Sequence, residues 1–387
     1  MTSETFCILP WIHMYANADG SVLPCCIAEH HQHMGNTQKN SIKEIWNSST
    51  YKQLRTDMLS GQRATQCSAC YRSEDQGSAS YRTSVNQQFA EFLPYAKDTN
   101  PDGSLDYMNL HYFDVRWSNI CNFKCRTCSS TYSSSWAKED GKKEIFIYAG
   151  GESNDKLYNE FMPHFKNMKE IYFAGGEPLL TEQHYQILDH LISIGKTDVK
   201  LRYNTNLSKL NYKQTSVLDY WTQFKNVTVF ASLDSWGGRA EYIREGTDWT
   251  VIEKNIKTIK TQVPNVILGV SSVISVFNIA TVKSFLDTLI ELLDAKFTFS
   301  CYNIINPDYY SMQVLPNHMK KQILDDLRQT TWPARYQDSI NSMITNLENS
   351  QFDADLHAKF VAKTNQYDTL RHRKFTEVFP ELKQLIP

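Results

Sequence analysis

The chain has 387 residues and a formal net charge of −2, with 41% hydrophobic and 21% charged residues. This composition is typical of a globular protein with a buried core, and it gives no reason to expect non-specific binding to nucleic acid. No apolar run approaches the roughly 18–20 residues that cross a membrane, and the N-terminus lacks the pattern of a signal peptide. We therefore expect a protein of the reducing cytoplasm, with no membrane partner and no clear nucleic-acid partner.

The first hundred residues are polar and irregular, and the sequence predicts few elements there. Asp19-Gly20 is a hairpin-turn signal between two short apolar segments. One helix is expected from Ile42 to Leu59, because the apolar residues between them are spaced for one helix face. Gly61 then provides a stop for this helix.

From about residue 107 the pattern alternates between strands and helices, after turn signals at residues 100–103. Six segments rich in β-branched and aromatic residues are expected to form buried strands, at residues 110–117, 169–176, 198–206, 226–234, 265–274 and 296–304. Helical segments are expected between them, at residues 181–195, 248–262 and 279–294. This alternation predicts a parallel sheet, either as a partial barrel or as an open doubly wound sheet. From about residue 315 the chain is expected to be mainly helical.

The nine cysteines fall into two groups and one isolated residue. In a reducing compartment, grouped cysteines act as metal ligands or redox groups more often than as disulfides. The two groups therefore predict two sites. The first group is Cys7, Cys25, Cys26, Cys67 and Cys70; the second is Cys121, Cys125 and Cys128; Cys301 stands alone.

The second group lies directly after the first predicted core strand, in the stretch "CNFKCRTC". Positions i, i+4 and i+7 share one helix face, so three buried and inert cysteines are one interpretation. The neighbours, among them Asn122, Lys124 and Arg126, are too polar for an apolar stripe. Thiolates on a short loop after a strand suit a soft metal centre, although zinc sites usually pair cysteines as C-x-x-C and need a fourth ligand.

The spacing C-x-x-x-C-x-x-C resembles the signature of the radical S-adenosylmethionine enzymes. The resemblance implies that Cys121, Cys125 and Cys128 bind three irons of a 4Fe–4S cluster. It also implies that the amine and carboxylate of S-adenosylmethionine chelate the fourth iron. The cofactor would then be cleaved to a 5′-deoxyadenosyl radical that takes a hydrogen atom from a substrate carbon.

A second motif follows the next predicted strand, in "YFAGGEPLL". It resembles the family's Gly-Gly-Glu motif, which implies that Gly175, Gly176 and Glu177 bind the methionine amine of the cofactor. Glycines allow the backbone to approach a ligand closely, and a carboxylate accepts hydrogen bonds from an ammonium group. Without the cysteine motif, the same residues would be read as a strand-to-helix turn that Pro178 ends.

Polar residues after the later strands also match places where the family binds the cofactor. The resemblance implies this role for Asn204, Asn206, Ser232, Asp234 and Arg244. Turn or helix caps for Ser232 and Asn206, and a surface ion pair for Arg244, are the alternatives.

The sequence departs from the family pattern at Thr127, because the residue before the last cluster cysteine is usually aromatic and lies against the adenine. Phe123 and Tyr132 are candidates to replace that contact.

The first group of cysteines suggests a separate centre. A hairpin at Asp19-Gly20 would bring Cys7 near Cys25, and "CSAC" supplies Cys67 and Cys70 as a metal knuckle does. The segment of residues 5–75 resembles the twitch module, a short form of the SPASM domain, which implies an auxiliary 4Fe–4S cluster. In the family this module usually follows the barrel, whereas here it precedes it. A structural zinc site with the same four ligands is the alternative.

Several residues stay without an assigned role. Cys26 is a spare ligand, an inert neighbour or a redox thiol, and Cys301 is a buried small residue or a residue that faces substrate; both are candidate hydrogen-atom donors. His30, His31 and His33 are expected to face solvent. No catalytic residue is otherwise indicated.

The resemblance implies an α/β fold, a partial (β/α)6 TIM-like barrel with a cysteine-rich N-terminal module and a helical C-terminal extension. These parts are predicted at residues 1–105, 106–314 and 315–387. The implied function is an oxidoreductase that oxidises or cross-links a peptide, protein or carbohydrate, with a flavodoxin or ferredoxin as electron donor. A redox-neutral epimerase and a zinc- or cluster-bearing protein without activity are the alternatives.

Overall fold

The computed structural model describes residues 3–29, 32–77, 79–294 and 296–386. Its residues divide into two compact units. The first unit comprises residues 1–121, 141–203 and 222–227, and the second comprises residues 122–140, 204–221 and 228–387. The predicted domain boundaries near residues 105 and 314 remain predictions.

The first unit contains a sheet whose strands lie in the order β7-β6-β4-β1-β2-β3. The strands are β1 (His13–Ala16), β2 (Ser21–Leu23), β3 (Gly35–Asn36), β4 (Tyr112–Val115), β6 (Glu170–Phe173) and β7 (Lys200–Thr205), whose last two residues belong to the second unit. Strands β1, β4, β6 and β7 pair in parallel, whereas β1, β2 and β3 pair antiparallel.

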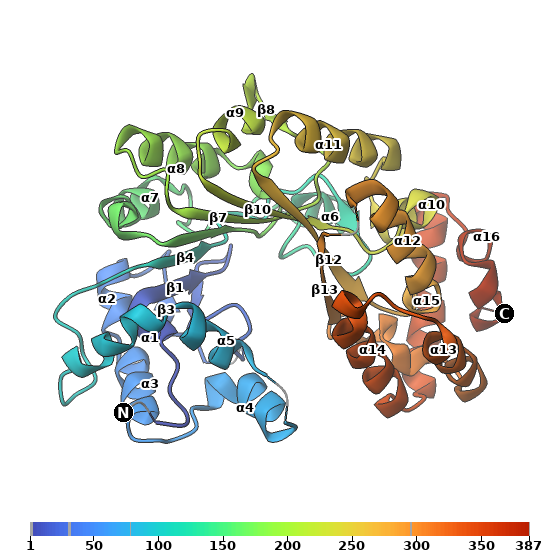
Figure 1. Ribbon diagram of the computed structural model, residues 1–387, viewed down its shortest axis with the longest axis horizontal. Coiled ribbons are helices and arrows are strands. Elements are labelled where there is room, and N and C mark those ends of the chain that lie inside the picture. Colours follow the sequence, from blue (N-terminus) through green and yellow to red (C-terminus); the bar gives the residue numbers. More distant parts are fainter. Residues whose placement is uncertain (1–2, 30–31, 78, 295, 387) are drawn as a thin grey trace. The chain divides into compact units, whose positions relative to one another are not determined.

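Seven α-helices belong to the described part of the first unit. They are α1 (Leu9–Ile12), α2 (Ile42–Trp46), α3 (Ser49–Leu59), α4 (Ser68–Asp75), α5 (Tyr81–Gln88), α7 (Asp155–Phe161) and α8 (Glu182–Ser193). Four 3-10 helices accompany them: η1 (Thr65–Cys67), η2 (Ala90–Asp98), η3 (Met162–Asn167) and η4 (Pro178–Leu180). Figure 1 shows α7 and α8 along the strands β4, β6 and β7, with α1 to α5 grouped around β1.

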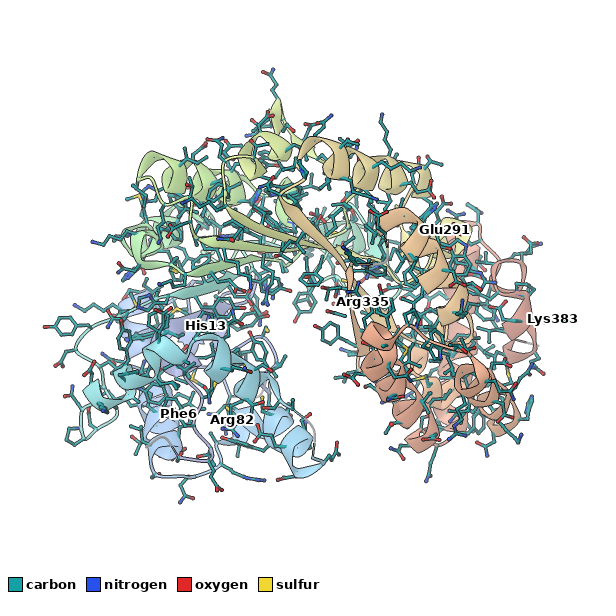
Figure 2. All side chains as sticks on the ribbon, in the orientation of Figure 1. Phe6, His13, Arg82, Glu291, Arg335 and Lys383 are labelled. Atoms are coloured by element: carbon teal, nitrogen blue, oxygen red, sulfur yellow. The ribbon has the colours of Figure 1, made fainter. Side chains whose placement is uncertain are left out.

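The two faces of this sheet differ in chemistry because side chains alternate along a strand. Phe113 of β4 packs edge-on against Phe161 and Phe165, on the side of α7. Its neighbours Tyr112 and Asp114 point to the opposite face, where His13 of β1 stacks on Tyr112 with ring centroids 4.4 Å apart. Figure 2 labels His13 among the side chains of this unit. One face is therefore an apolar core, and the other carries buried polar groups.

The second unit contains three further sheet strands in the order β10-β12-β13. They are β10 (Asn226–Ser232), which begins in the first unit, β12 (Val266–Ile274) and β13 (Thr298–Asn303), and β12 pairs with β13 in parallel. Two small ladders join β5 (Lys124–Cys125) to β11 (Arg244–Glu245), and β8 (Asn211–Tyr212) to β9 (Thr215–Ser216).

The helices of the second unit include the predicted C-terminal set, which Figure 1 shows grouped beyond β13. The helices are α6 (Ser134–Glu139), α9 (Val217–Trp221), α10 (Gly237–Ile243), α11 (Trp249–Gln262), α12 (Val282–Leu293), α13 (Asn317–Gln329), α14 (Gln337–Asn349), α15 (Ala354–Arg371) and α16 (Phe375–Val378). Short 3-10 helices are η5 (Ile279–Thr281), η6 (Asp308–Tyr310), η7 (Met312–Val314), η8 (Ala334–Tyr336) and η9 (Pro380–Leu385). Within the described residues, no helix has the length and apolar character to cross a bilayer.

The predicted fold class, an α/β protein with a parallel sheet and a cysteine-rich N-terminal region, is confirmed. All six predicted core strands occur, because runs of β-branched and aromatic residues suit a sheet that is buried. The predicted hairpin also occurs, with Gly20 at φ +78° between β1 and β2. This left-handed conformation explains the glycine at the turn.

The single helix expected from residue 42 to residue 59 is wrong, because two helices form there. Ser48 caps the second helix through its side chain, which accepts a hydrogen bond from the Tyr51 backbone N–H. Asn47 ends the first helix and is held outside it, since its side chain bonds both the N–H and the carbonyl of Leu105 at 3.0 and 2.8 Å. The helical spacing of the apolar residues continues from α2 into α3, so the sequence pattern did not indicate the break between them.

We expect the first unit to lose stability below pH 6.5 because of His184. Burial lowers the pKa of this histidine from 6.5 to about 3, and its Nε2 pairs with the Tyr203 hydroxyl at 3.0 Å. Between pH 6.5 and about pH 3, this histidine binds a proton in the unfolded chain but not in the folded chain. The free energy of unfolding therefore falls by about 1.4 kcal/mol for each unit that the pH falls. His184→Phe should flatten the dependence of the unfolding free energy on pH between pH 4 and 6. Urea unfolding of the metal-free chain measures this, and an exposed substitution, His318→Asn, is the control; equal slopes in all three chains would contradict it.

Candidate metal centres

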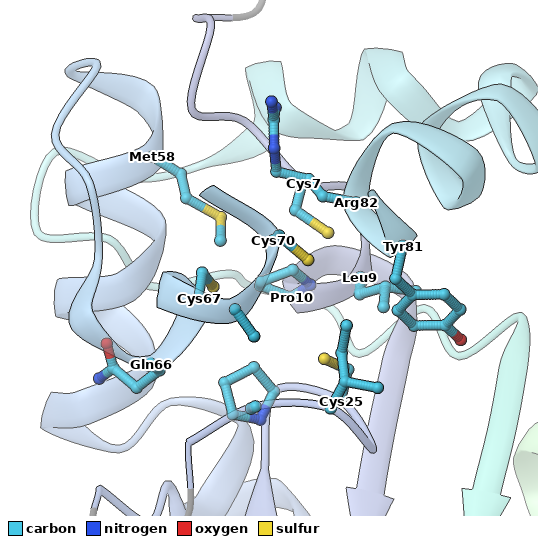
Figure 3. Close-up of a pocket in the computed structure, with 14 residues that line it drawn as sticks. Cys7, Leu9, Pro10, Cys25, Met58, Gln66, Cys67, Cys70, Tyr81 and Arg82 are labelled. Carbon is cyan, nitrogen blue, oxygen red and sulfur yellow. The ribbon is translucent and has the colours of Figure 1, made fainter. Parts of the chain in front are cut away.

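Four cysteines of the N-terminal group line one hollow in the first unit, as predicted. Cys7 precedes α1, Cys25 follows β2, and Cys67 and Cys70 lie on η1 and α4. The hollow has about 380 Å³ of empty space, part of it open to solvent, and Figure 3 shows the four thiols around it. The rest of the lining is mainly apolar: Leu9, Pro10, Pro24, Ile27, Ala28, Met58 and Ala69, together with Gln66, Tyr81 and Arg82.

Burial in this apolar lining keeps the four thiols protonated when no metal is bound. It raises the pKa of Cys67 to about 12, and it raises the pKa values of Cys7, Cys25 and Cys70 as well. Four thiols in one apolar hollow ionise readily only when a cationic centre compensates their charges. The donor set therefore fits a thiolate-bound metal centre.

A zinc ion and an iron–sulfur cube place their cysteine sulfurs at different spacings. A zinc ion holds its sulfurs at about 2.3 Å, which places neighbouring sulfurs about 3.8 Å apart. Among the residues that the structure describes, no three cysteine, histidine or carboxylate side chains gather closely enough to bind one ion. A cube of four irons takes one thiolate on each iron and so needs a wider arrangement. Four cysteine ligands are the donor set of both a structural zinc site and a 4Fe–4S cube, so the zinc alternative stays open on the donor set alone.

Cys26 does not line this hollow, although it is adjacent to Cys25. Burial raises the pKa of its thiol to about 11; Asp114 also raises that pKa, while Arg116 and Arg202 lower it. Its sulfur therefore lies near the charged side chains on the polar face of the sheet. His33 is exposed, as expected, whereas His30 and His31 lie outside the described residues.

Arg82 supports the hollow from α5. Its guanidinium pairs with Glu74 and donates to the carbonyl of Phe6 at 2.8 Å, so it fixes the backbone directly before Cys7. Figure 2 labels Arg82 and Phe6 in this region. Sequence reasoning missed this arginine, because only its spatial neighbours, and no local motif, reveal its role.

The second predicted site begins in the first unit with Cys121 and the turn at residues 175–177. The Glu177 N–H donates to the carbonyl of Ile120 at 2.7 Å, so this turn rests on the residue before Cys121. Gly176 has φ +50°, and a Cβ atom there would lie 2.4 Å from the same carbonyl oxygen. The Glu177 side chain is buried and accepts from the Leu179 N–H at 3.1 Å. The two sequence motifs therefore meet where β4 and β6 end.

The second unit holds Cys125 and Cys128 on a loop that β5 and β11 fix in place. Arg244 of β11 is the register partner of Cys125, and its Nη1 lies 3.9 Å from the Cys125 sulfur. The guanidinium is also bidentate to Asp234, at 2.8 and 3.1 Å. The predicted Arg244 is thus in an ion pair, but a buried one, since the Asp234 side chain is only 1% exposed. Hydrogen bonds to a cysteine sulfur tune the potential of a bound cluster.

The remaining predicted residues have different surroundings in the second unit. Asn206 caps a turn, because its Oδ1 accepts from the backbone N–H and hydroxyl of Ser208, and its Nδ2 donates to Asn122 at 2.9 Å. Asn204 lies 3.5 Å from the hydroxyl of Ser271, and Ser232 is half-buried at the end of β10. Their predicted contacts with a cofactor remain predictions.

The two candidates for adenine stacking also differ. Phe123 is buried at 1% exposure, whereas Tyr132 is 40% exposed. Thr127 between them is half-buried. Cys301 is half-buried on β13, and its thiol donates toward the Ser339 carbonyl at 3.9 Å; its role as a candidate hydrogen-atom donor remains a prediction.

Comparison with known families decides the nature of the N-terminal region. Residues 7–71 match the SPASM family, described as an iron-sulfur cluster-binding domain. This region is similar to the SPASM family and is named the SPASM-type domain for that similarity. The match covers the four thiols that line the hollow and confirms the predicted iron–sulfur module.

The SPASM-type domain accompanies a fold that is similar to some solved structures. Native anSMEcpe with bound AdoMet is 18% identical, with a TM-score of 0.41 over 59% of this chain and 60% of that chain. TYW1 with a lysine-pyruvate adduct bound is 11% identical, with a TM-score of 0.32 over 57% of this chain and 72% of that chain. This chain thus spans less than two thirds of the first of these structures. No curated protein sequence matches it.

We expect Cys67→Ala to halve the iron of the reconstituted protein and Cys26→Ala to leave it unchanged. Cys67 lines the hollow of the SPASM-type domain, whereas Cys26 does not. Two full cubes contain about eight irons, so the loss should be about four irons for each chain. Iron and sulfide assays after anaerobic reconstitution measure this. Equal iron in the two variants would show that the ligands are assigned wrongly.

We expect Arg244→Gln to destabilise the second unit by about 3–5 kcal/mol, because it leaves the buried carboxylate of Asp234 without its partner. The double variant Arg244→Gln with Asp234→Asn should recover most of that loss, since it buries no unpaired charge. Urea unfolding of the metal-free chain provides the free energies. If the double variant has as low a free energy of unfolding as Arg244→Gln, the loss does not come from the unpaired charge of Asp234, and the prediction is wrong.

Proposed function

We propose that the chain is a radical S-adenosylmethionine enzyme with two 4Fe–4S clusters. Cys121, Cys125 and Cys128 hold one cluster, and the SPASM-type domain holds the other. When bound, the first cluster supplies the electron that cleaves S-adenosylmethionine and generates a 5′-deoxyadenosyl radical. The observation that carries the proposal is the hydrogen bond from the Glu177 N–H to the carbonyl of Ile120, at 2.7 Å.

That hydrogen bond supports the proposal because it joins two motifs that were recognised separately. The residue before Cys121 and the turn at Gly176 are more than fifty positions apart, yet their backbones are in contact. Glycine at position 176 leaves no side chain between the turn and this backbone. Such an arrangement lets backbone groups at residues 175–177 bind a cofactor beside a cluster.

The other residues have separate tasks in this proposal. Arg244 donates toward Cys125 and stabilises its thiolate, and Asp234 holds Arg244 in place. Asn206 orders the turn after β7. The mainly apolar lining of the hollow in the SPASM-type domain would tune the redox potential of a bound cluster, because a hydrophobic shell controls solvent access and dielectric.

We further propose a peptide or protein as substrate, oxidised by two electrons, with the second cluster accepting one of them. A flavodoxin or ferredoxin would supply the electron that starts the reaction. Four cysteines around the second cluster support electron transfer, because they leave no iron open to bind a substrate.

A redox-neutral reaction is the second candidate function. The Cys26 thiol lies outside the lining of the cluster hollow, and the charges of Asp114, Arg116 and Arg202 act on it, so it is a candidate hydrogen-atom donor and not a cluster ligand. Under this alternative, Cys26→Ala would abolish product and spare cofactor cleavage. Cys301 is the other candidate donor, so full turnover in both Cys26→Ala and Cys301→Ala would exclude this alternative.

We expect the anaerobically reconstituted chain to release 5′-deoxyadenosine from S-adenosylmethionine when a strong reductant is added. Cys125→Ala should lose this activity, because it removes an iron ligand, while Cys301→Ala should keep it. Chromatographic assay of 5′-deoxyadenosine measures the outcome. A colourless protein that holds zinc and no iron would refute the proposal.

A further inference from the structure

The cysteine loop of the second unit is held by charge on both sides of Cys125. Lys124 directly before it pairs with Glu139 at 2.6 Å, and Arg126 directly after it pairs with Asp368 at 2.6 Å. Asp368 belongs to α15, in the C-terminal extension. The helix lies about 240 positions along the chain from the residue that it binds, so no local motif reveals this contact.

Arg126 is deeply buried, and the arrangement around it satisfies most of its charge. Its side chain is 0% exposed, and its guanidinium lies 3.8 Å from the centre of the Tyr242 ring. Its Nε donates to the Tyr242 carbonyl at 3.2 Å, and its backbone N–H donates to the carbonyl of Ile243 at 2.8 Å. A buried guanidinium needs a carboxylate partner, and Asp368 supplies it.

Asp368 joins three separate segments. Its carboxylate accepts from Arg126, from the Tyr242 hydroxyl at 2.6 Å and from the Phe375 N–H at 2.6 Å. Its side chain is 13% exposed, so solvent screens these bonds only slightly. A carboxylate with three charge-assisted or polar donors is held strongly.

The same helix contributes a second contact near the loop. Arg371 of α15 is 1% exposed and pairs with Glu139 at 2.7 Å, on the carboxylate that also binds Lys124. Its guanidinium lies 4.7 Å from the ring of Trp136, whose Nε1 donates to the Cys125 carbonyl at 2.7 Å. Two ion pairs from one helix therefore converge on the segment that contains Cys125.

We propose that α15 is a positioning element that holds the Cys125–Cys128 loop ready for its cluster and fixes the net charge beside it. Asp368 and Arg371 are positioning residues, since they act through Arg126 and Glu139. The part that concerns the cluster rests on the proposed function. The part that concerns the loop does not.

A purely stabilising role would predict something different. Buried ion pairs contribute little net stability compared with apolar residues, so their place on the loop matters more than their energy. The pair Arg126–Asp368 is close to neutral as a whole. Arg126 directly follows Cys125 in the chain, so removing one charge of the pair leaves the other uncompensated on the loop or on its partner α15, and the potential of a cluster held by the loop responds to the sign of that charge.

The first experiment uses hydrogen exchange of the metal-free full chain. Asp368→Asn should speed exchange of the backbone N–H groups of residues 124–128 about tenfold, because the loop opens more often without its charged anchor. Glu139→Gln should act in the same direction. The matched control is Asp325→Asn, which breaks the Lys321–Asp325 pair within α13 and touches neither the loop nor its partners. Unchanged exchange in both loop variants would overturn the positioning role.

The second experiment measures the reduction potential of the cluster whose electron paramagnetic resonance signal changes on addition of S-adenosylmethionine. Asp368→Asn leaves the Arg126 charge uncompensated, so the potential should rise. Arg126→Gln leaves the carboxylate, so it should fall. The double variant of Asp368→Asn with Arg126→Gln removes both charges, so the potential of its cluster should return close to the original value. Shifts of equal sign in both single variants, or no return in the double variant, would refute the charge assignment.

The two experiments distinguish a failure of the positioning role of α15 from a failure of the proposed function. If the unaltered chain binds no iron, the proposed function fails, and the exchange experiment still decides whether α15 holds the loop. If Asp368→Asn does not fold, the double variant of Asp368→Asn with Arg126→Gln carries the same comparison, because it leaves no buried guanidinium at position 126 without a carboxylate.

Discussion

Two adjacent parallel strands place the residues on which the candidate site depends. In β4 and β6, Tyr112 lies opposite Glu170 and Phe113 opposite Ile171, so both strands end at the same edge of the sheet. The segments that follow the two strands leave the sheet at this edge, and the Glu177 N–H donates to the Ile120 carbonyl between them. A shift of one residue would turn every side chain of the strand to the other face and separate the two turns.

The sequence predicted much of this architecture, because the interactions that specify it are local. Buried strands appear as runs of β-branched residues, and the first hairpin appears as Asp19-Gly20 with the second residue at positive φ. The break between α2 and α3 was not predicted, because it depends on Asn47 meeting Leu105, far along the chain. The periodicity of apolar residues within a segment does not predict a contact with a residue so far along the chain.

The sequence predicted the candidate ligands of the site but not the charged residues that hold the surrounding segments in place. Thiols and glycines belong to short motifs, so their spacing identifies them. Asp234 beside Arg244, and Asp368 beside Arg126, are ordinary charged residues in sequence that become buried partners only in the fold. The direction of Cys26 was also unpredictable, because neighbouring residues outside a strand follow no fixed alternation.

The four thiols of the hollow have a consequence for assembly of the centre that they line. Because burial keeps them protonated, each must release its proton when it becomes a ligand. Incorporation is therefore coupled to the acidity of the medium, and acid opposes it through mass action. The ligands also come from segments that span residues 7 to 70, so a bound centre would cross-link the start of the chain much as a covalent staple does.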